Sequence, residues 1–196
     1  MADLRARLRS RGSDLVVRTD EPEAVLPDLA DRVDADAVHV HTRPTPEERA
    51  VEAWVEDALD ARLVRHWGHT LYHPDDLPMD VADVDDTYTP FRKRVESAAT
   101  VRAPHPVPDL PARPAVDPGE PPTAADLGVE VDPLDDRAAL DFEGGETAGL
   151  ERLEEYVWET DSLRTYKETR NGLLGRNFSS KLSPWLNEGC LSPRRV

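Results

Sequence analysis

Residues 36–67 read DAVHVHTRPTPEERAVEAWVEDALDARLVRHW, and this stretch decides the fold class. Residues 36–41 and 63–67 are short runs of apolar and β-branched residues, which is typical of buried strands. A helix is predicted between them from Pro46, because Glu47 and Glu48 in its first turn suit the positive end of the helix dipole. A strand, a helix and a strand in this order predict a parallel sheet with a crossover helix.

The predicted helix carries an apolar stripe with the i, i+3, i+4, i+7, i+8 spacing of one buried face. The stripe consists of Val51, Trp54, Val55, Ala58 and Leu59. We expect the neighbouring acidic residues, Glu52, Glu56, Asp57 and Asp60, to face solvent.

The residues before this unit continue the same alternation. Residues 3–11 predict a helix that stops at Gly12, and residues 14–18 (DLVVR) predict a strand. A further helix is predicted over 20–33, with Pro22 in its first turn. The order is therefore that of a doubly wound α/β fold, although the chain begins on a helix, so we expect the first strand of such a unit to be missing.

A proline-rich stretch begins at Ala103, and neither a helix nor a central strand accommodates prolines at such short intervals. We predict an extended, semi-stiff acidic linker that reaches Thr147. Helical spacing resumes at Leu150. The predicted organisation is an α/β unit over 1–103, a linker over 104–147 and a helical unit over 148–196.

The composition is strongly acidic: 40 Asp and Glu face 24 Lys and Arg, for a net charge of −16. Only 3 of the basic residues are lysines. A dense carboxylate surface with few alkyl-ammonium groups holds hydration where salt is high, which favours a halophilic cytoplasm. An acidic protein from a GC-rich genome is the alternative interpretation.

No apolar run is long enough to cross a membrane, and the opening residues lack the apolar core of a signal peptide. We therefore expect a cytoplasmic protein with no membrane association, and we expect a monomer. The single cysteine, Cys190, forms no internal disulfide, which suits a reducing compartment.

The sign of the charge reverses near the end of the chain. Residues 161–196 carry 7 basic and 3 acidic side chains. This basic stretch indicates either tolerance of a phosphate-bearing ligand or a solvated helix face. Within it, Ser179, Ser180 and Ser183 could donate hydrogen bonds to a diphosphate beside Lys181, or they could simply cap short helices, which we expect at Ser183 and at Ser192.

Two other clusters have open interpretations. His39 and His41 lie on one face of a predicted strand, as a metal pair would, but no cysteine or carboxylate spacing completes a site, so we predict no metal site. The run Phe91 to Arg94 combines an aromatic ring with three basic residues, which suits either DNA contact or packing between domains.

Two long stretches resemble one family, the DNA photolyases and in particular the DASH-type cryptochromes. Residues 67–96 contain TLYHPDDLP and YTPFRKRVE and resemble the end of the antenna-binding α/β domain of that family. Residues 166–194, YKETRNGLLGRNFSSKLSPWLNEGCLSPR, resemble the opening of its helical flavin-binding domain. The resemblance implies a Rossmann-like antenna domain lacking its first strand, a proline-rich linker and the first helices of an all-α FAD-binding domain.

The resemblance also implies cofactor contacts. In the family, the matching tyrosine and serine-rich run contact FAD. The resemblance therefore implies that FAD is bound by Tyr166, Ser179, Ser180, Lys181, Leu182 and Ser183. It implies flavin binding at these positions and no catalytic residue. For the antenna chromophore, Arg43 and Pro44 occupy the region where DASH relatives carry a folate-binding carboxylate, which argues against folate and leaves a different antenna or none.

The implied function is that of a deoxyribodipyrimidine photolyase, a carbon–carbon lyase in which FAD, driven by blue light, splits cyclobutane pyrimidine dimers in UV-damaged DNA. The substrate-contacting residues of the family would lie beyond Val196, so we expect an inactive fragment that binds FAD poorly. The alternatives are a DASH cryptochrome acting as a blue-light photoreceptor or single-stranded DNA binder, and an inactive gene remnant.

Overall fold

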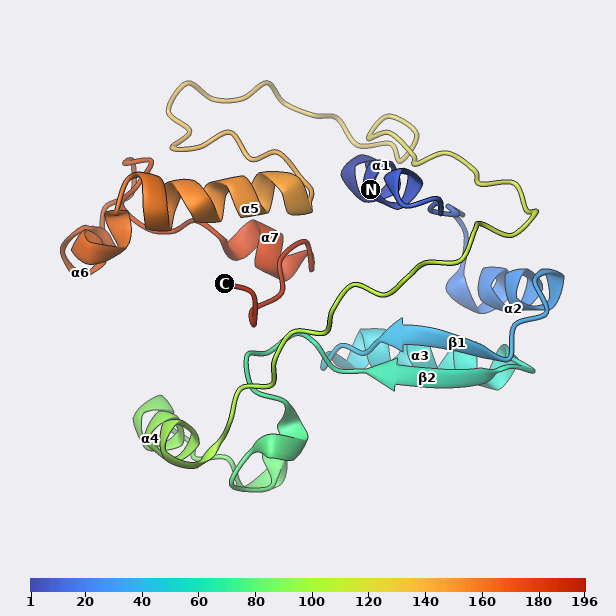
Figure 1. Ribbon diagram of the computed structural model, residues 1–196, viewed down its shortest axis with the longest axis horizontal. Coiled ribbons are helices and arrows are strands. Elements are labelled where there is room, and N and C mark those ends of the chain that lie inside the picture. Colours follow the sequence, from blue (N-terminus) through green and yellow to red (C-terminus); the bar gives the residue numbers. More distant parts are fainter.

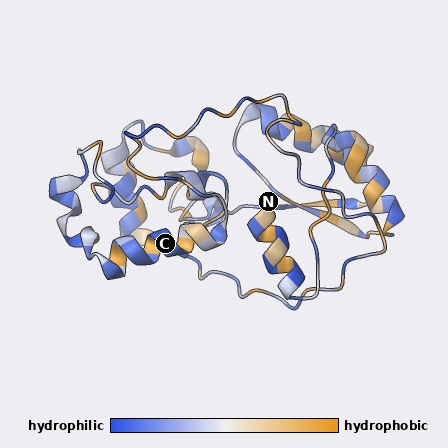
Figure 2. Cartoon of the chain, turned by 90° about the horizontal axis from the view of Figure 1, so that it is seen from above, coloured by the Kyte–Doolittle hydropathy of each residue, from blue (hydrophilic) through white to orange (hydrophobic).

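The computed structural model describes all residues, 1–196, which form two groups of elements (Figure 1). The α-helices and strands are α1 (Ala2–Ser10), α2 (Pro22–Arg32), β1 (Ala37–His41), α3 (Pro46–Ala58), β2 (Arg62–His66), α4 (Tyr88–Ala98), α5 (Glu146–Glu154), α6 (Tyr166–Thr169) and α7 (Ser183–Asn187). Short 3-10 turns and one π-helical turn, Glu155–Glu159, complete the regular structure. Figure 2 shows hydrophobic and hydrophilic residues alternating along the helices, as amphipathic helices require.

β1 and β2 form a parallel pair, in register from Ala37 opposite Arg62 to His41 opposite His66. α3 connects them and lies behind the sheet in Figure 1. The parallel pair with its crossover helix confirms the predicted α/β, Rossmann-like class.

The two faces of this sheet differ in chemistry. Arg65 of β2 reaches α3, where its guanidinium bonds Glu52 at 3.1 Å and Glu56 at 2.8 Å. Because side chains alternate along a strand, His39 and His66 point to the opposite face, where Nδ1 of His39 lies 2.8 Å from Nε2 of His66. One face of the sheet is therefore helix-covered and the other carries histidines.

The predicted strand at residues 14–18 is wrong. The segment is extended, but its only backbone bond to a neighbouring segment runs from the amide of Val17 to the carbonyl of Pro118, at 2.7 Å. Proline has no N–H group to return, so a ladder cannot continue at this position. Val17 is nevertheless buried against the proline-rich stretch.

The predicted apolar stripe of α3 is only partly buried. Val55 is 3% exposed, whereas Trp54 is 55% exposed. Glu52, which we expected in solvent, is half-buried and accepts hydrogen bonds from Thr42 and Arg65. A sheet of two strands is narrower than the stripe, so part of the apolar face remains uncovered.

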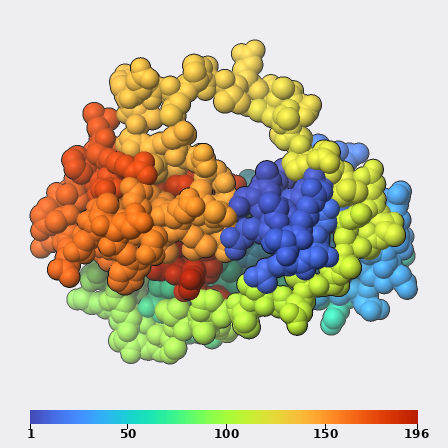
Figure 3. All heavy atoms as spheres, turned by 45° about the horizontal axis from the view of Figure 1, so that its top comes forward, coloured from blue at the N-terminus to red at the C-terminus, as the bar shows by residue number.

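Arg5 of α1 holds the proline-rich stretch against the first unit. Its side chain is buried, and its guanidinium donates to the carbonyls of Leu15 and Pro118 at 3.0 and 3.1 Å and to the carboxylate of Glu120 at 2.9 Å. Asp14 lies 3.3 Å away and adds a second carboxylate. Figure 3 shows this stretch wrapping beside the N-terminal helix.

The second unit has its own small core. Its buried members are Leu140, Leu182, Trp185 and Leu191. The indole N–H of Trp185 donates to the carbonyl of Glu143 at 2.8 Å, so the approach to α5 is fixed onto α7. The helix predicted at Ser192 is wrong: Ser192 begins a turn, closed by the amide of Arg195 on the Ser192 carbonyl at 2.9 Å.

Candidate functional site

The five residues Ser179–Ser183, here called the serine segment, connect the loop after α6 to α7 and lie against α5. Leu182 is 4% exposed and belongs to the core with Trp185. A short helix begins here with Pro184 in its first turn, as the sequence predicted, but its N-cap is Leu182, and Ser183 is its first residue and makes no side-chain cap. The segment is therefore anchored at one end by apolar burial.

Arg152 of α5 anchors the other end, and the sequence reading missed it. Its side chain is 2% exposed. The guanidinium donates to the carbonyls of Arg176 at 3.0 Å, Ser179 at 3.3 Å and Ser180 at 3.0 Å, and to Oδ1 of Asn177 at 2.9 Å. The only sequence signal was a basic residue next to Leu153, inside a stretch of apolar spacing.

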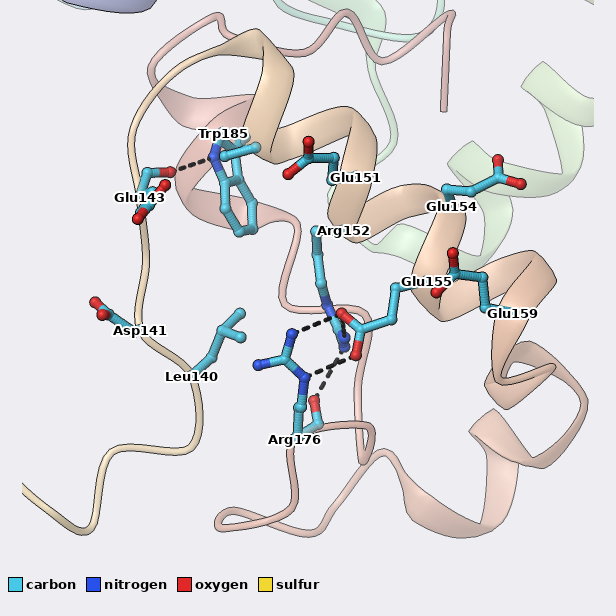
Figure 4. A pocket seen from close by; sticks show the side chains of 11 residues that line it. Leu140, Asp141, Glu143, Glu151, Arg152, Glu154, Glu155, Glu159, Arg176 and Trp185 are labelled. Carbon is cyan, nitrogen blue, oxygen red and sulfur yellow. Dashed lines mark hydrogen bonds and ion pairs between the residues drawn. The ribbon is translucent and has the colours of Figure 1, made fainter.

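Glu155 pairs with both Arg152 and Arg176 and offsets one of their two positive charges, as Figure 4 shows. Its carboxylate accepts two 2.7 Å hydrogen bonds from Arg176 and lies 3.1 Å from Arg152. The bonds from Arg176, and then that from Arg152, lower the pKa of Glu155 to about 2. Arg152 also lies 5.2 Å from the ring centre of Tyr156, a cation–π contact.

The backbone of the serine segment has free donors. The amides of its five residues donate to no acceptor in the protein. Lys181 has φ +55°, in the left-handed region, and Leu182 follows in the right-handed helical region. Successive residues of opposite handedness turn their N–H groups toward one side and form a concavity that suits anions.

The side chain of Lys181 is used within the loop. Its ammonium donates to the carbonyl of Gly175 at 2.8 Å and lies 3.4 Å from Oγ of Ser179. Burial, with the nearby charge of Arg152, lowers the pKa of Lys181. Lys181 therefore contributes to the shape of the segment as well as to its charge.

Tyr166, the remaining predicted FAD contact, is the first residue of α6 and is 40% exposed. No hydrogen bond joins it to the serine segment. It lies near Tyr156, whose hydroxyl is buried without a partner and whose pKa is raised by that burial and by Tyr166. The structure thus brings five of the six predicted residues together and places Tyr166 on a separate element.

A pocket of about 380 Å³ adjoins this cluster and is drawn in Figure 4. Its charged lining is mostly acidic, with Asp141, Glu143, Glu151, Glu154, Glu155 and Glu159 against Arg152 and Arg176. Carboxylates repel phosphate oxygens, so an anionic ligand is better served by the amides of the serine segment than by this pocket.

A second pocket, of about 930 Å³, opens at the carboxyl ends of β1 and β2. Three aromatic side chains line it, Trp67, Tyr72 and Phe91. Pro44 also lines it, while Arg43 beside it pairs with Glu48 at 3.0 Å. Crevices at the carboxyl ends of parallel strands are the usual ligand sites of such folds.

The remaining clusters have local partners. His41 and His69 stack with ring centres 4.5 Å apart, and no group of three or more metal-ligating side chains comes together. In the basic run of α4, Arg92 pairs with Glu96 at 3.8 Å and Arg94 with Asp85 at 3.1 Å. No helix is long and apolar enough to cross a membrane.

Comparison with known families gives one match: the model described as DNA photolyase matches residues 1–112. Curated relatives named Cryptochrome DASH match almost the whole chain. The protein from Natronomonas pharaonis is 57% identical over 99% of this chain and 42% of its own length. That from Gloeobacter violaceus is 50% identical over 100% of this chain and 40% of its own length. The chain thus spans about two-fifths of the length of these relatives.

Solved structures of similar proteins superpose closely. A cryptochrome from Synechocystis sp. PCC6803 aligns with a TM-score of 0.91 and 38% identity, covering 98% of this chain and 41% of the other. A class III photolyase from Agrobacterium tumefaciens aligns with a TM-score of 0.77 and 25% identity, covering 99% and 40%. The arrangement of both units is therefore shared with cryptochromes and photolyases.

Proposed function

The chain belongs to the DNA photolyase family, with cryptochromes DASH among its relatives, and from this we propose that it carries the FAD-contacting segment of a blue-light flavoprotein that acts on DNA. We propose three functional parts: an antenna unit over 1–103, a linker over 104–147 and a flavin-contacting unit over 148–196.

One observation carries the proposal: the serine segment presents five free amides in a concave backbone, held from behind by Arg152. The hydroxyls of Ser179, Ser180 and Ser183 add further donors. A diphosphate offers several charged acceptor oxygens, and hydrogen bonds to charged groups are among the strongest in proteins. These residues would hold the diphosphate of FAD, with Tyr166 as an additional contact.

The activity we propose for the whole protein is light-driven splitting of pyrimidine dimers in UV-damaged DNA. Reduced FAD, when bound, would lend an electron to the dimer under blue light and take it back once the ring has split. The residues of this chain bind and orient that cofactor and take no part in bond breaking. A DASH-type role as a photoreceptor or binder of single-stranded DNA is the second candidate, favoured by the 57% identity to a Cryptochrome DASH.

The first test is titration of the purified chain with FAD and, separately, with riboflavin, which lacks the diphosphate. We expect FAD to bind more tightly than riboflavin. Replacing Ser179, Ser180 and Ser183 together by alanine should weaken FAD binding about tenfold and leave riboflavin unchanged. Ser97→Ala, an exposed serine of α4, is the matched control. Equal affinity for the two flavins would contradict a diphosphate site.

A second test separates the two activities. A version of the protein that includes the substrate-contacting part expected beyond Val196 is loaded with FAD and illuminated with blue light in the presence of an oligonucleotide that contains one pyrimidine dimer. Splitting in duplex DNA favours a photolyase, and binding or splitting confined to single strands favours the DASH role. Absence of both flavin and DNA binding would favour an inactive gene remnant.

We also propose that the pocket at the carboxyl ends of β1 and β2 holds a planar antenna chromophore between its aromatic side chains. Neither Arg43 nor Pro44 offers a carboxylate, which argues against folate, whereas Asp75 of the pocket lining does offer one, so folate is included among the chromophores tested. Binding should quench the fluorescence of Trp67, so candidate chromophores can be screened by measuring tryptophan emission. Quenching should disappear in Trp67→Phe and persist in Trp158→Phe, a 72% exposed residue of the other unit. Quenching retained in Trp67→Phe would place the chromophore elsewhere.

A further inference from the structure

We propose that Arg152 is the positioning residue of the serine segment: it holds the segment's carbonyls inward and thereby leaves its amides free for an anionic ligand. This inference rests on the proposed function, because the ligand is the diphosphate of FAD. Arg152 itself does not contact that ligand.

The donor inventory of Arg152 is completely used. A guanidinium has five N–H groups in a rigid planar fan. Here they meet five acceptors, namely the carbonyls of Arg176, Ser179 and Ser180, Oδ1 of Asn177 and the carboxylate of Glu155. No donor remains for a ligand, so the side chain acts through the loop.

The direction of the peptide groups follows from these bonds. A peptide N–H points roughly opposite to the carbonyl of the same peptide plane. The carbonyls of Ser179 and Ser180 are held by Arg152, so the amides of Ser180 and Lys181, which share their peptide planes, are turned away from α5. This accounts for two of the five free N–H groups of the half-buried segment.

The charge of Arg152 does not explain anion binding by itself. Glu155 lies 3.1 Å from it and is also held by Arg176, so the cluster of three carries only one net positive charge. The attraction for a diphosphate comes chiefly from the ordered amides. A lysine at this position would keep the charge but supply only three donors, without a planar fan.

The decisive variants are therefore Arg152→Lys, which keeps the charge, and Arg152→Met, which keeps the apolar stem alone. Arg164→Met is the matched control, because Arg164 lies in the same unit, is 83% exposed and pairs only with Asp161. Circular dichroism confirms that each variant retains its helices.

The first readout needs no flavin. Trypsin can cleave after Arg176 and Lys181, the two basic residues of the held loop. We expect cleavage at these bonds to accelerate about tenfold in both Arg152 variants, since the loop loses buried hydrogen bonds. Cleavage after Lys167, outside the loop, should not change. Unchanged cleavage at Lys181 in variants that keep their helices would overturn the inference.

The second readout compares FAD with riboflavin in the same variants. We expect about a tenfold loss of FAD affinity and no loss for riboflavin, whereas general destabilisation would weaken both. If Arg152→Lys restored wild-type FAD affinity, charge rather than the five-donor fan would be responsible, and the inference would fail. If the wild-type chain binds no FAD, the proposed function fails, and the trypsin result alone decides whether Arg152 positions the segment.

Discussion

The carboxylate of Asp3 accepts hydrogen bonds from both the backbone amide and the hydroxyl of Thr147, at 3.2 and 2.7 Å. The N-terminal helix thereby caps α5. The residue at the helix's own N-cap is Gly145, with φ +114° and no side chain to accept these bonds. Arg7 reinforces the contact through a 2.9 Å ion pair with Glu146. A cap supplied from elsewhere in the chain thus joins the two units.

Asp3→Ala should destabilise α5 by about 1 kcal/mol, the usual cost of losing a helix cap. Hydrogen exchange followed by mass spectrometry should show the first turn of α5 opening, while α3 remains protected. Asp57→Ala, an exposed carboxylate of α3, is the control. Equal exchange in the two variants would show that the cap contributes nothing.

Stability should fall as the pH is lowered below about 4.5. The pKa of Glu155 is lowered from 4.5 to about 2, chiefly by Arg176, and hydrogen bonds from Thr147 lower that of Asp3. A depressed pKa in the folded state means stability that is present above the unfolded pKa and is lost toward the folded one. Urea midpoints between pH 7 and pH 2 measure this loss.

The same titration assigns the effect to Glu155. Glu155→Gln should be less stable than the wild type at pH 7, because Arg152 and Arg176 lose their shared carboxylate. Its stability should also change less between pH 4.5 and pH 2. A variant as pH-dependent as the wild type would place the effect on other carboxylates.

Gly149→Ala should destabilise the second unit although alanine favours helices by about 1 kcal/mol over glycine. An added Cβ would lie 2.9 Å from Cγ of Leu191 and 3.0 Å from Cγ of Trp185. Overpacking of this kind costs about 1–3 kcal/mol. Gly144→Ala, with no atom near its added Cβ, is the control in thermal unfolding. A more stable Gly149→Ala would show that the core can yield at this point.

Replacing Lys181 separates its backbone conformation from its side chain. The left-handed φ of +55° costs a non-glycine residue about 1–2 kcal/mol. Lys181→Gly removes that strain and Lys181→Ala keeps it, while both lose the bond to Gly175. We therefore expect the glycine variant to unfold at higher urea than the alanine variant. The opposite order would indicate that the segment relaxes out of this conformation.

Salt should stabilise the chain. With a net charge of −16, like charges repel one another across the folded surface. Raising KCl from about 0.1 M to about 1 M shortens the screening length from about 10 Å to about 3 Å. We expect a higher urea midpoint in the concentrated salt. A midpoint independent of KCl would argue against adaptation to a salt-rich cytoplasm.

The local sequence pattern was sufficient to predict the central α/β unit. The strands at 36–41 and 63–67 and the helix from Pro46 were predicted to within about a residue, because apolar spacing and first-turn residues act over short distances. The segment at 14–18 has the same local pattern but no ladder. Whether an extended segment becomes a strand depends on the donors of its neighbour, and that neighbour, Pro118, lies far away in the sequence.

In the candidate site, too, the features set by local sequence could be predicted and those set by distant partners could not. The serine segment was found through family resemblance, and its residues are contiguous. Arg152 was missed because all its partners except Glu155 lie 24 to 28 residues away and are mostly backbone carbonyls, which leave no trace in the sequence. The placement of Tyr166 on a separate element from the serine segment likewise depends on tertiary packing, which the sequence does not reveal.

The contacts of Arg5 also constrain the order in which the chain can fold. Its partners Pro118 and Glu120 follow it by 113 and 115 residues. At a synthesis rate of about 5–20 residues per second, α1 would leave the ribosome roughly 6–23 s before these partners. A helix of nine residues is barely stable alone in water. The first helix to be made is therefore among the last to settle, and its final structure depends on the completion of a loop that spans more than half of the protein.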